Sequence, residues 1–448
     1  MSTIVSFAYY ARNRGTNLHA LASAANALGF DCIVVTRRTE ELSNTTFFKE
    51  VVYIDRWDLD TLDATLKQLQ KRYHIKSVVS EDGIFHPDGL LGATVADLAK
   101  RHGLPSQNAD ALWRTNNKYL TRDALTHAGL RTIRYGLAQD VTSFQSVLQH
   151  VGLPLIIKPL CGAGSTFILK ADTPEEALDH FLYAQEHFQH AHYAKLLCRH
   201  QHTYQDKSGR QISFDPLHHF LIEQYIPGRE FSIECIVTED EVLPVLIHDK
   251  LSVTQRGRVF LEHILIAPPA SFTLQEIEIA KRYAIDAVKA TGLQNSVIHV
   301  EMRYDSTLGP QIIEINPRIG AGAIPRSLKT MTGIDPYKAQ LQLLTKQFIP
   351  QSSYPIIAPP HAMFWLFSPH SGRLKEVSGL EDLDKLPGII DVELTYPIDS
   401  IIHGDDEECF LVQCWMQAES AKQAIDTYQQ AFDAVTIDVE PTKQMTHA

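Results

Sequence analysis

Apolar runs and amphipathic segments alternate through the first hundred residues. Short apolar runs at 3–9, 31–36 and 51–55 are bounded by polar residues, which is typical of buried strands. Between them, apolar residues recur at helical spacing over 18–29 and 59–73. Strands that alternate with helices predict a parallel sheet with helices on its faces.

The pattern changes beyond the first hundred residues. Asn116 or Asn117 is positioned to cap a new amphipathic helix. The apolar segments 153–158 and 166–170 then predict two strands joined by a glycine-containing loop. This region therefore mixes helices with short strands rather than repeating the strand–helix units of the N-terminus.

Longer strands dominate the middle of the chain. Apolar runs predict strands at 220–226, 229–237 and 241–247, followed by a helix over about 274–291. A strand hairpin at 296–316 closes this region. The last hundred residues combine further strands with one helix, SAKQAIDTYQQAF, which predicts an α+β arrangement there.

Composition narrows the classes of function. Of the 448 residues, 44% are hydrophobic and 21% are charged, which is ordinary for a globular protein. Lys and Arg number 41 against 53 Asp and Glu, and the resulting net charge of −12 argues against a nucleic-acid partner. This charge is still compatible with a local basic pocket for a small anion.

Cysteine spacing and hydropathy indicate a compartment. The six cysteines form no CxxC pair, so a disulfide framework is not expected and a reducing environment is the default. No stretch approaches the ~20 apolar residues that a membrane span needs. The opening residues carry too short an apolar run for a signal peptide. We therefore expect a cytoplasmic protein with no membrane partner.

The hairpin SVIHVEMRYD-STLG-PQIIEINPR is the most informative segment. If the four residues Ser306–Gly309 form its turn, Asp305 pairs with Pro310 and Glu301 falls opposite Glu314. Like charges directly opposite each other on a sheet are destabilising. Two carboxylates ~4 Å apart repel by about 4 kcal/mol at an effective dielectric constant near 20. A cation between them would relieve this repulsion.

The same hairpin offers a set of oxygen ligands. In this register His299 lies opposite Asn316, so Glu301, Glu314 and Asn316 share one face. Two carboxylates and an amide oxygen suit Mg²⁺ that is shared with substrate phosphates. A solvated strand face with a coincidental glutamate pair is the alternative. The following run, residues 317–322, favours the metal because it places an arginine and two glycines where an anion could approach.

A second segment suggests a phosphate site. The loop Cys161–Ser165 contains Gly162 and Gly164, whose backbone amides could point at a phosphate. Lys158 ends the preceding apolar strand, so it either extends toward solvent or reaches a bound anion. An ordinary glycine turn is the alternative for this loop taken alone.

Two further groups of polar residues are compatible with a nucleotide. Lys118 and Arg122 are spaced i and i+4 on a helix, so an anion would relieve their repulsion, although two solvated surface cations are a common alternative. The strand end 223–226 could expose backbone groups to an adenine edge, and Glu230, just past a Pro-Gly turn, could accept a ribose hydroxyl. Taken alone, that segment is simply a hairpin with acidic residues.

Together, in this order, these elements resemble the ATP-grasp superfamily of carboxylate–amine ligases. The resemblance covers roughly residues 1–345 and implies two subdomains that clamp ATP. It implies ATP-binding roles for Lys118, Lys158, Gly162, Gly164, Ser165, Glu223, Gln224, Tyr225, Ile226 and Glu230. It implies that Glu301, Glu314 and Asn316 hold two Mg²⁺ ions, with Mn²⁺ as a substitute. Lys250 is similar to the basic residue that reaches the γ-phosphate, and Arg318 to the residue that binds the carboxylate and the acyl phosphate.

The resemblance also implies a domain organisation and a substrate class. It predicts an N-terminal α/β domain at 1–107, an ATP-grasp domain at 108–345 with a mobile lid at about 148–222, and a C-terminal α+β domain at 346–448. The segment EINPRIGAGAIPR, followed by a long tail, is most similar to the L-amino acid ligases. These use amino acids as carboxylate and amine substrates.

Several alternatives stay open at the level of sequence. Another ATP-grasp carbon–nitrogen ligase, of purine or cofactor synthesis, fits the same motifs, and a non-catalytic nucleotide-binding module is a third hypothesis. His263 is either a substrate-pocket residue or a solvent-facing strand residue. The His-rich segment 187–219, with a turn expected at Asp206–Gly209, fits no clean metal-ligand set. The oligomeric state is open, with a homodimer among the alternatives.

Overall fold

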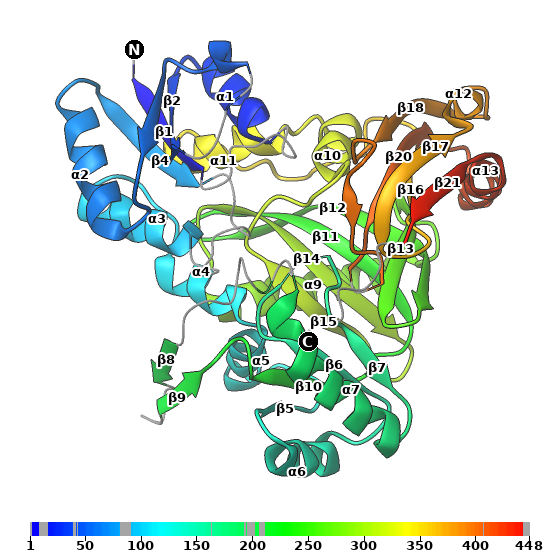
Figure 1. Cartoon of the computed structure of the whole chain (residues 1–448). Helices are drawn as coiled ribbons and strands as arrows, with labels where there is room; N and C mark the ends of the chain where they lie inside the picture. Colours follow the sequence, from blue (N-terminus) through cyan, green and yellow to red (C-terminus); the bar gives the residue numbers. More distant parts are fainter. Residues whose placement is uncertain are drawn as a thin grey trace.

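The computed structural model describes most of the chain. The described residues are 2–8, 17–38, 42, 44–80, 91–162, 164–191, 194, 202–205, 211–405 and 407–441. The expected turn at Asp206–Gly209, and Ala163 of the glycine loop, lie outside them. The predicted fold class is confirmed: a parallel α/β domain is followed by antiparallel sheets with helices (Figure 1).

The N-terminal domain is a four-stranded parallel sheet in the order β3-β2-β1-β4. Its strands are β1 (Thr3–Ala8), β2 (Asp31–Arg37), β3 (Glu50–Ile54) and β4 (Ile75–Ser80), and its helices are α1 (Asn17–Ala27), α2 (Leu59–Gln70) and α3 (Leu91–Arg101). Every residue of β1 is buried, because helices cover both faces of the sheet. Helix α11 (Pro336–Leu344) also packs here through Leu341 and Leu344, although it follows the ATP-binding motifs in sequence.

Two short helices, α4 (Ala109–Asn116) and α5 (Lys118–His127), connect this domain to the second sheet, which is described below. Asn117 caps α5, because its side chain accepts hydrogen bonds from the backbone N–H groups of Tyr119 and Leu120. The sequence pattern did not separate the preceding helix, α4. The Asn117 cap places Lys118 at the buried first residue of α5.

The second sheet is antiparallel, in the order β5-β10-β6-β7, and carries the glycine loop. Its elements are β5 (Tyr135–Ala138), α6 (Val141–Val151), β6 (Leu155–Pro159), β7 (Leu169–Ala171), α7 (Pro174–His187) and β10 (Phe220–Gln224), with the hairpin β8 (His202–Gln205) and β9 (Gln211–Phe214) inserted. The strand expected at 166–170 begins later than predicted, at Leu169. Ser165 and Phe167 take φ values of 51° and 54°, which interrupt an extended chain.

The largest sheet has eight antiparallel strands and spans two of the expected domains (Figure 1). Its order is β15 (Gly309–Asn316), β14 (Ser296–Asp305), β11 (Arg229–Val237), β12 (Val242–Arg256), β13 (Val259–Ala267), β16 (His361–Phe367), β20 (Phe410–Gln417) and β18 (Ile389–Leu394). Helix α9 (Leu274–Thr291) packs on it through Ala280, Ala284 and Val288. Strand β16 pairs directly with β13, so C-terminal strands extend the sheet that carries the hairpin.

The C-terminal region completes the fold with a small three-stranded sheet. It contains β17 (Gly372–Ser378), β19 (Ile401–Ile402) and β21 (Thr436–Glu440), with α12 (Leu380–Leu383) and α13 (Ala421–Ala434), while α10 (Ile324–Thr332) follows the metal-candidate hairpin. Strands and helices are mixed here, as the α+β prediction required. None of the described helices has the length and apolar character needed to cross a membrane.

Candidate active site

One cavity of about 290 Å³ lies where the two antiparallel sheets face each other, and every candidate site residue lines it. These residues are Lys118, Lys158, Gly162, Gly164, Ser165, Glu223, Gln224, Tyr225, Ile226, Glu230, Lys250, Glu301, Glu314, Asn316 and Arg318. Arg122, which the sequence paired with Lys118 as a possible anion site, lines the cavity as well. The wall also contains residues that had been given no site role: Glu262, Arg303, Trp365, Glu408 and Phe410. Residues almost 300 positions apart in sequence therefore meet around one space.

The hairpin has the predicted pairing at its functional end. Glu301 lies opposite Glu314, and His299 lies opposite Asn316. The expected pairing of Asp305 with Pro310 is wrong, because Asp305 pairs with Gly309. The Asp305 carboxylate accepts hydrogen bonds from the next backbone N–H groups and tightens the turn. A bulge in β15 then restores the register before Glu314.

Each of the two opposed carboxylates has a lysine partner. Glu314 lies 2.9 Å from Lys118 Nζ, and Glu301 lies 3.2 Å from Lys250 Nζ. Burial would raise the pKa of the Glu301 carboxyl, but Lys250 and His299 hold that pKa well below its usual range. Asn316 also donates a hydrogen bond to Glu301 over 3.2 Å. The site therefore presents ionised oxygen donors, which is the donor chemistry that Mg²⁺ requires.

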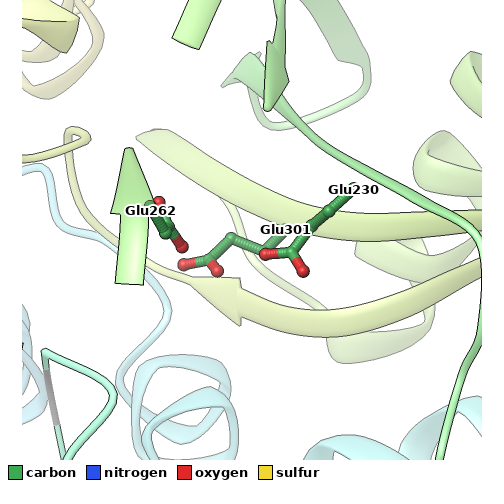
Figure 2. A group of neighbouring side chains, drawn as sticks. All are labelled: Glu230, Glu262 and Glu301. Carbon is green, nitrogen blue, oxygen red and sulfur yellow. The ribbon is translucent and has the colours of Figure 1, made fainter. Parts of the chain in front are cut away.

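The carboxylates of Glu230, Glu262 and Glu301 lie close together (Figure 2), and Lys250 forms an ion pair with each of them. Lys250 Nζ lies 2.7 Å from a Glu230 oxygen and also donates to Glu262. Burial would lower the pKa of Lys250, but its three acidic neighbours raise it well above the usual value. The sequence reasoning missed Glu262. The only available signal was its alternation along β13, a strand that the sequence pattern did not reveal.

The cavity wall also contains two further buried cations, Lys158 and Arg122. Lys158 and Arg122 each lie 2.5 Å from a carboxylate oxygen of Glu223. Burial and the nearby Arg122 and Lys118 charges lower the pKa of Lys158, although Glu223 opposes this. The carboxylate of Glu223 is thus engaged in ion pairs, and its backbone belongs to β10, which at this residue pairs with both β5 and β6.

The expected adenine segment is partly occupied by protein contacts. The backbone N–H of Gln224 donates to the Arg134 carbonyl, and that of Tyr225 donates to the Pro154 carbonyl, both over 2.9 Å. Arg303 donates to the Ile226 carbonyl over the same distance. Several backbone groups of this segment are therefore engaged within the protein, and its adenine-binding role stays a prediction.

Glu230 is held by two cations. Its second carboxylate oxygen accepts a hydrogen bond of 2.7 Å from Arg303, in addition to the bond from Lys250. The Arg303 guanidinium also lies 5.2 Å from the centre of the Tyr225 ring. These contacts fix the position of the Glu230 side chain. Its ribose-binding role stays a prediction.

Arg318 has a buried nitrogen that is not satisfied by the described part of the chain. One terminal nitrogen donates to the Ile319 carbonyl over 3.1 Å, while Nε has no hydrogen-bond partner there. An unsatisfied buried N–H is costly unless a ligand supplies an acceptor. A carboxylate or phosphate in this cavity would supply one.

The glycine run after Arg318 is explained first by packing. A Cβ atom at Gly320 would lie 2.5 Å from the Ile324 side chain and 3.1 Å from His299 Nδ1. The backbone therefore approaches Ile324 so closely that any larger residue would force the Ile324 side chain to shift. The sequence reasoning assigned these glycines to anion binding alone.

A buried acid–base network supports this wall of the cavity. His299 Nδ1 lies 2.7 Å from Glu234, which is 1% exposed, and His248 Nε2 lies 2.8 Å from the Ser327 hydroxyl. Burial would lower the pKa of His299, but Glu234 raises it to about 9. Burial would raise the pKa of Glu234, but His299 and His248 lower it to about 2. Sequence reasoning missed Glu234, because strand β11 reads as uniformly buried.

This network gives a pH-dependent stability. Because the folded-state pKa of His299 is raised from its ordinary 6.5 to about 9, its contribution is complete below pH 6.5 and is lost as the pH rises through 9. We expect the free energy of unfolding to fall over that interval, and to fall less in Glu234→Gln. Urea denaturation of both proteins from pH 6 to 9 measures this. Parallel pH profiles would contradict the assigned His299–Glu234 ion pair.

His263 lies outside the cavity wall and has structural contacts. Thr254 lies 2.7 Å from its Nε2 and the Tyr428 hydroxyl lies 2.8 Å from its Nδ1. The ring therefore joins the β12–β13 hairpin to α13 of the C-terminal region. Neither of the two roles that the sequence left open describes this position.

Comparisons with known proteins agree with this geometry. Residues 151–326 match the family described as ATP-grasp domain, and residues 364–440 match L-amino acid ligase C-terminal domain 2. The chain is 24% identical to the alanine–anticapsin ligase of Bacillus subtilis (strain 168) over 286 residues, which are 60% of this chain and 55% of that protein. The matched region thus spans about half the length of that relative.

Two solved structures share the fold. The L-amino acid ligase from Bacillus licheniformis has a TM-score of 0.77 at 18% identity, covering 98% of this chain and 99% of that one. The biotin carboxylase domain of Hydrogenobacter thermophilus 2-oxoglutarate carboxylase, in complex with MgADP, has a TM-score of 0.67 at 18% identity, covering 98% and 91%. The two family matches support an ATP-dependent carbon–nitrogen ligase. The chain carries an ATP-grasp domain and an L-amino acid ligase C-terminal domain, and it is similar to the ATP-grasp carboxylate–amine ligases, among them the L-amino acid ligases.

Proposed function

We propose that this protein joins the carboxylate of an amino acid to an amine, with ATP as the energy source and ADP and phosphate as products. The observation that carries the proposal is a single cavity that combines buried lysines, opposed carboxylates and the unsatisfied Arg318. The similarity to an alanine–anticapsin ligase favours amino acids as substrates. A cytoplasmic location and a homodimer stay predictions.

The reaction needs an activated carboxylate. A carboxylate oxygen attacks the γ-phosphorus of ATP, the bond to ADP breaks, and an acyl phosphate forms. The amine then attacks the acyl carbon, phosphate leaves, and the nitrogen loses a proton. Phosphoryl transfer requires mainly positioning and charge neutralisation. Lys118 and Lys158 are the protein groups available to neutralise phosphate oxygens.

The metal would be held by Glu301, Glu314 and Asn316, and we infer two Mg²⁺ ions from the resemblance. Bound Mg²⁺ supplies charge neutralisation at the phosphates. Arg318 would hold the substrate carboxylate, and its Nε gains the acceptor that it lacks among the described residues. The same guanidinium can donate to the oxyanion that forms when the amine attacks.

A paired-substrate screen tests the function. Purified protein is incubated with ATP, Mg²⁺ and the twenty L-amino acids singly and in pairs, and phosphate release and product mass are read together. Phosphate release together with a new amide is expected. Phosphate release that occurs only when a carboxylate other than an amino acid is added would favour a ligase of purine or cofactor synthesis. The absence of turnover together with nucleotide binding would favour a binding module.

The glycine loop should become more ordered when nucleotide binds. Residues 160–166 connect β6 and β7, and the backbone N–H of Glu408 donates to the Gly164 carbonyl over 3.0 Å. Hydrogen bonds from a bound phosphate would order the loop further. Hydrogen exchange with and without a nonhydrolysable ATP analogue measures this, with the buried strand β1, residues 3–8, as internal control. Equal protection of 160–166 in both states would rule out a nucleotide-ordered lid.

A further inference from the structure

Glu408 brings a carboxylate from the C-terminal region into the cavity wall. It lies just before β20, and its side chain accepts a hydrogen bond of 2.8 Å from the backbone N–H of Glu262. Its own backbone N–H donates to the Gly164 carbonyl over 3.0 Å. Both contacts fix the carboxylate between the glycine loop and β13, next to the carboxylates that face Lys250.

Glu408 differs from the other acids of the cavity in its lack of a cationic partner. Each of the others has a lysine or arginine within ion-pair distance: Glu223, Glu230, Glu262, Glu301 and Glu314. Among the described residues, Glu408 forms no ion pair, and its only side-chain hydrogen bond comes from the Glu262 backbone. A partly buried carboxylate beside other carboxylates is costly to ionise without a cation.

A second, independent feature of the cavity indicates a ligand that carries both a negative and a positive group. Arg318 Nε is a buried donor that has no hydrogen-bond partner in the described chain, and Arg318 lines the same cavity, so an anion there would satisfy it. Trp365 and Phe410, whose ring centres are 6.0 Å apart, line the same cavity as Glu408. Aromatic rings attract ammonium groups as well as apolar side chains. A carboxylate, an ammonium and an apolar side chain together describe an amino acid.

We propose that Glu408 is the specificity-determining residue that binds the primary ammonium of an amino substrate, flanked by Trp365 and Phe410. The proposal rests on the proposed ligase function. The ammonium belongs either to the amino acid that is activated or to the amine that attacks it. Both sources have the same chemistry, so the experiment separates them.

The test compares wild type with Glu408→Gln, which keeps the shape and removes the charge. Hydroxylamine, which is uncharged at neutral pH, replaces the amine and traps the acyl phosphate as a hydroxamate. If Glu408 binds the activated amino acid, the KM for L-alanine should rise roughly tenfold to a hundredfold, whereas that for propionate should not change. If it binds the attacking amine, hydroxamate formation should be normal while dipeptide formation falls by a similar factor. Unchanged values in both assays would overturn the proposal.

Two controls separate this inference from folding and from the ligase function itself. Glu376→Gln removes the same charge from an exposed position of the C-terminal region and should leave every value unchanged. Thermal stabilisation by L-alanine with a nonhydrolysable ATP analogue and Mg²⁺ needs no turnover. A wild type that forms no product refutes the ligase function, whereas equal stabilisation of wild type and Glu408→Gln by L-alanine, with normal dipeptide formation, refutes the role of Glu408.

Discussion

Glu314→Gln is expected to remove almost all ATP-dependent phosphate release and to leave the fold intact. The glutamine can still accept a hydrogen bond from Lys118, which lies 2.9 Å from Glu314. It cannot supply the negative charge that, with that of Glu301, the proposed Mg²⁺ site requires. Charge neutralisation by a bound metal is worth several kcal/mol in the transition state, so a loss of about a thousandfold is expected. Phosphate release at saturating Mg²⁺ measures it.

The choice of glutamine follows from the buried lysine. Glu314→Ala would leave the ammonium of Lys118 without its partner, and breaking a buried ion pair costs about 3–5 kcal/mol. The alanine variant would therefore confuse loss of activity with loss of stability. Glu278→Gln, on the exposed face of α9, is the matched control. Near wild-type phosphate release by Glu314→Gln would contradict the metal assignment.

The sequence predicted the parts of the site that depend on local pairing. Strand alternation and a short turn place Glu301 opposite Glu314, because both residues belong to one hairpin. The glycine loop with Lys158, and the cap that positions Lys118, are also local features. Their meeting in one cavity required the family resemblance, because no local pattern brings residues 118 and 314 together.

The residues that were missed reach the cavity through long-range pairing. Glu262 faces Lys250 only because β12 and β13 form a hairpin beyond the predicted strand ends. Glu408 and Trp365 enter because β16 pairs with β13 and then with β20, across the expected boundary at 346. Sheet extension of this kind is decided by the fit between whole strands, and the sequence pattern of either strand alone does not specify its partner.

Charge compensation is the other feature that the sequence could not show. The Glu301–Glu314 pair suggested that only a bound cation could make the arrangement tolerable. In the structure Lys118 and Lys250 already compensate the two carboxylates. Lys118 comes from helix α5, and Lys250 comes from β12, which β11 separates from β14 in the same sheet, so neither contact is local in sequence. Metal binding would then have to redistribute these ion pairs rather than relieve bare repulsion.

Arg318→Lys is expected to reduce ligation by about a hundredfold while ATP affinity changes little. Arg318 has one terminal nitrogen bound to the Ile319 carbonyl, and its buried Nε has no acceptor in the described chain. A guanidinium can therefore keep its hydrogen bond to the protein and still donate to a carboxylate. A lysine has a single nitrogen for both hydrogen bonds. The grip should strengthen as charge gathers on the acyl oxygen, so the loss belongs in kcat/KM.

The magnitude and the controls decide between catalysis and structure. Loss of one such donor costs on the order of 3 kcal/mol in the transition state, or about a hundredfold in rate. Lys118 and Lys158 stay in place to bind the triphosphate, so the Kd for an ATP analogue should be close to that of wild type. The matched control is Arg326→Lys. Arg326 lies on α10 and forms an exposed ion pair with Asp391 of β18, so this variant should keep full activity. If the role of Arg318 is only structural, Arg318→Lys should either stay active or lose thermal stability. Equal losses of ATP binding and of ligation would also exclude a role confined to the acyl group.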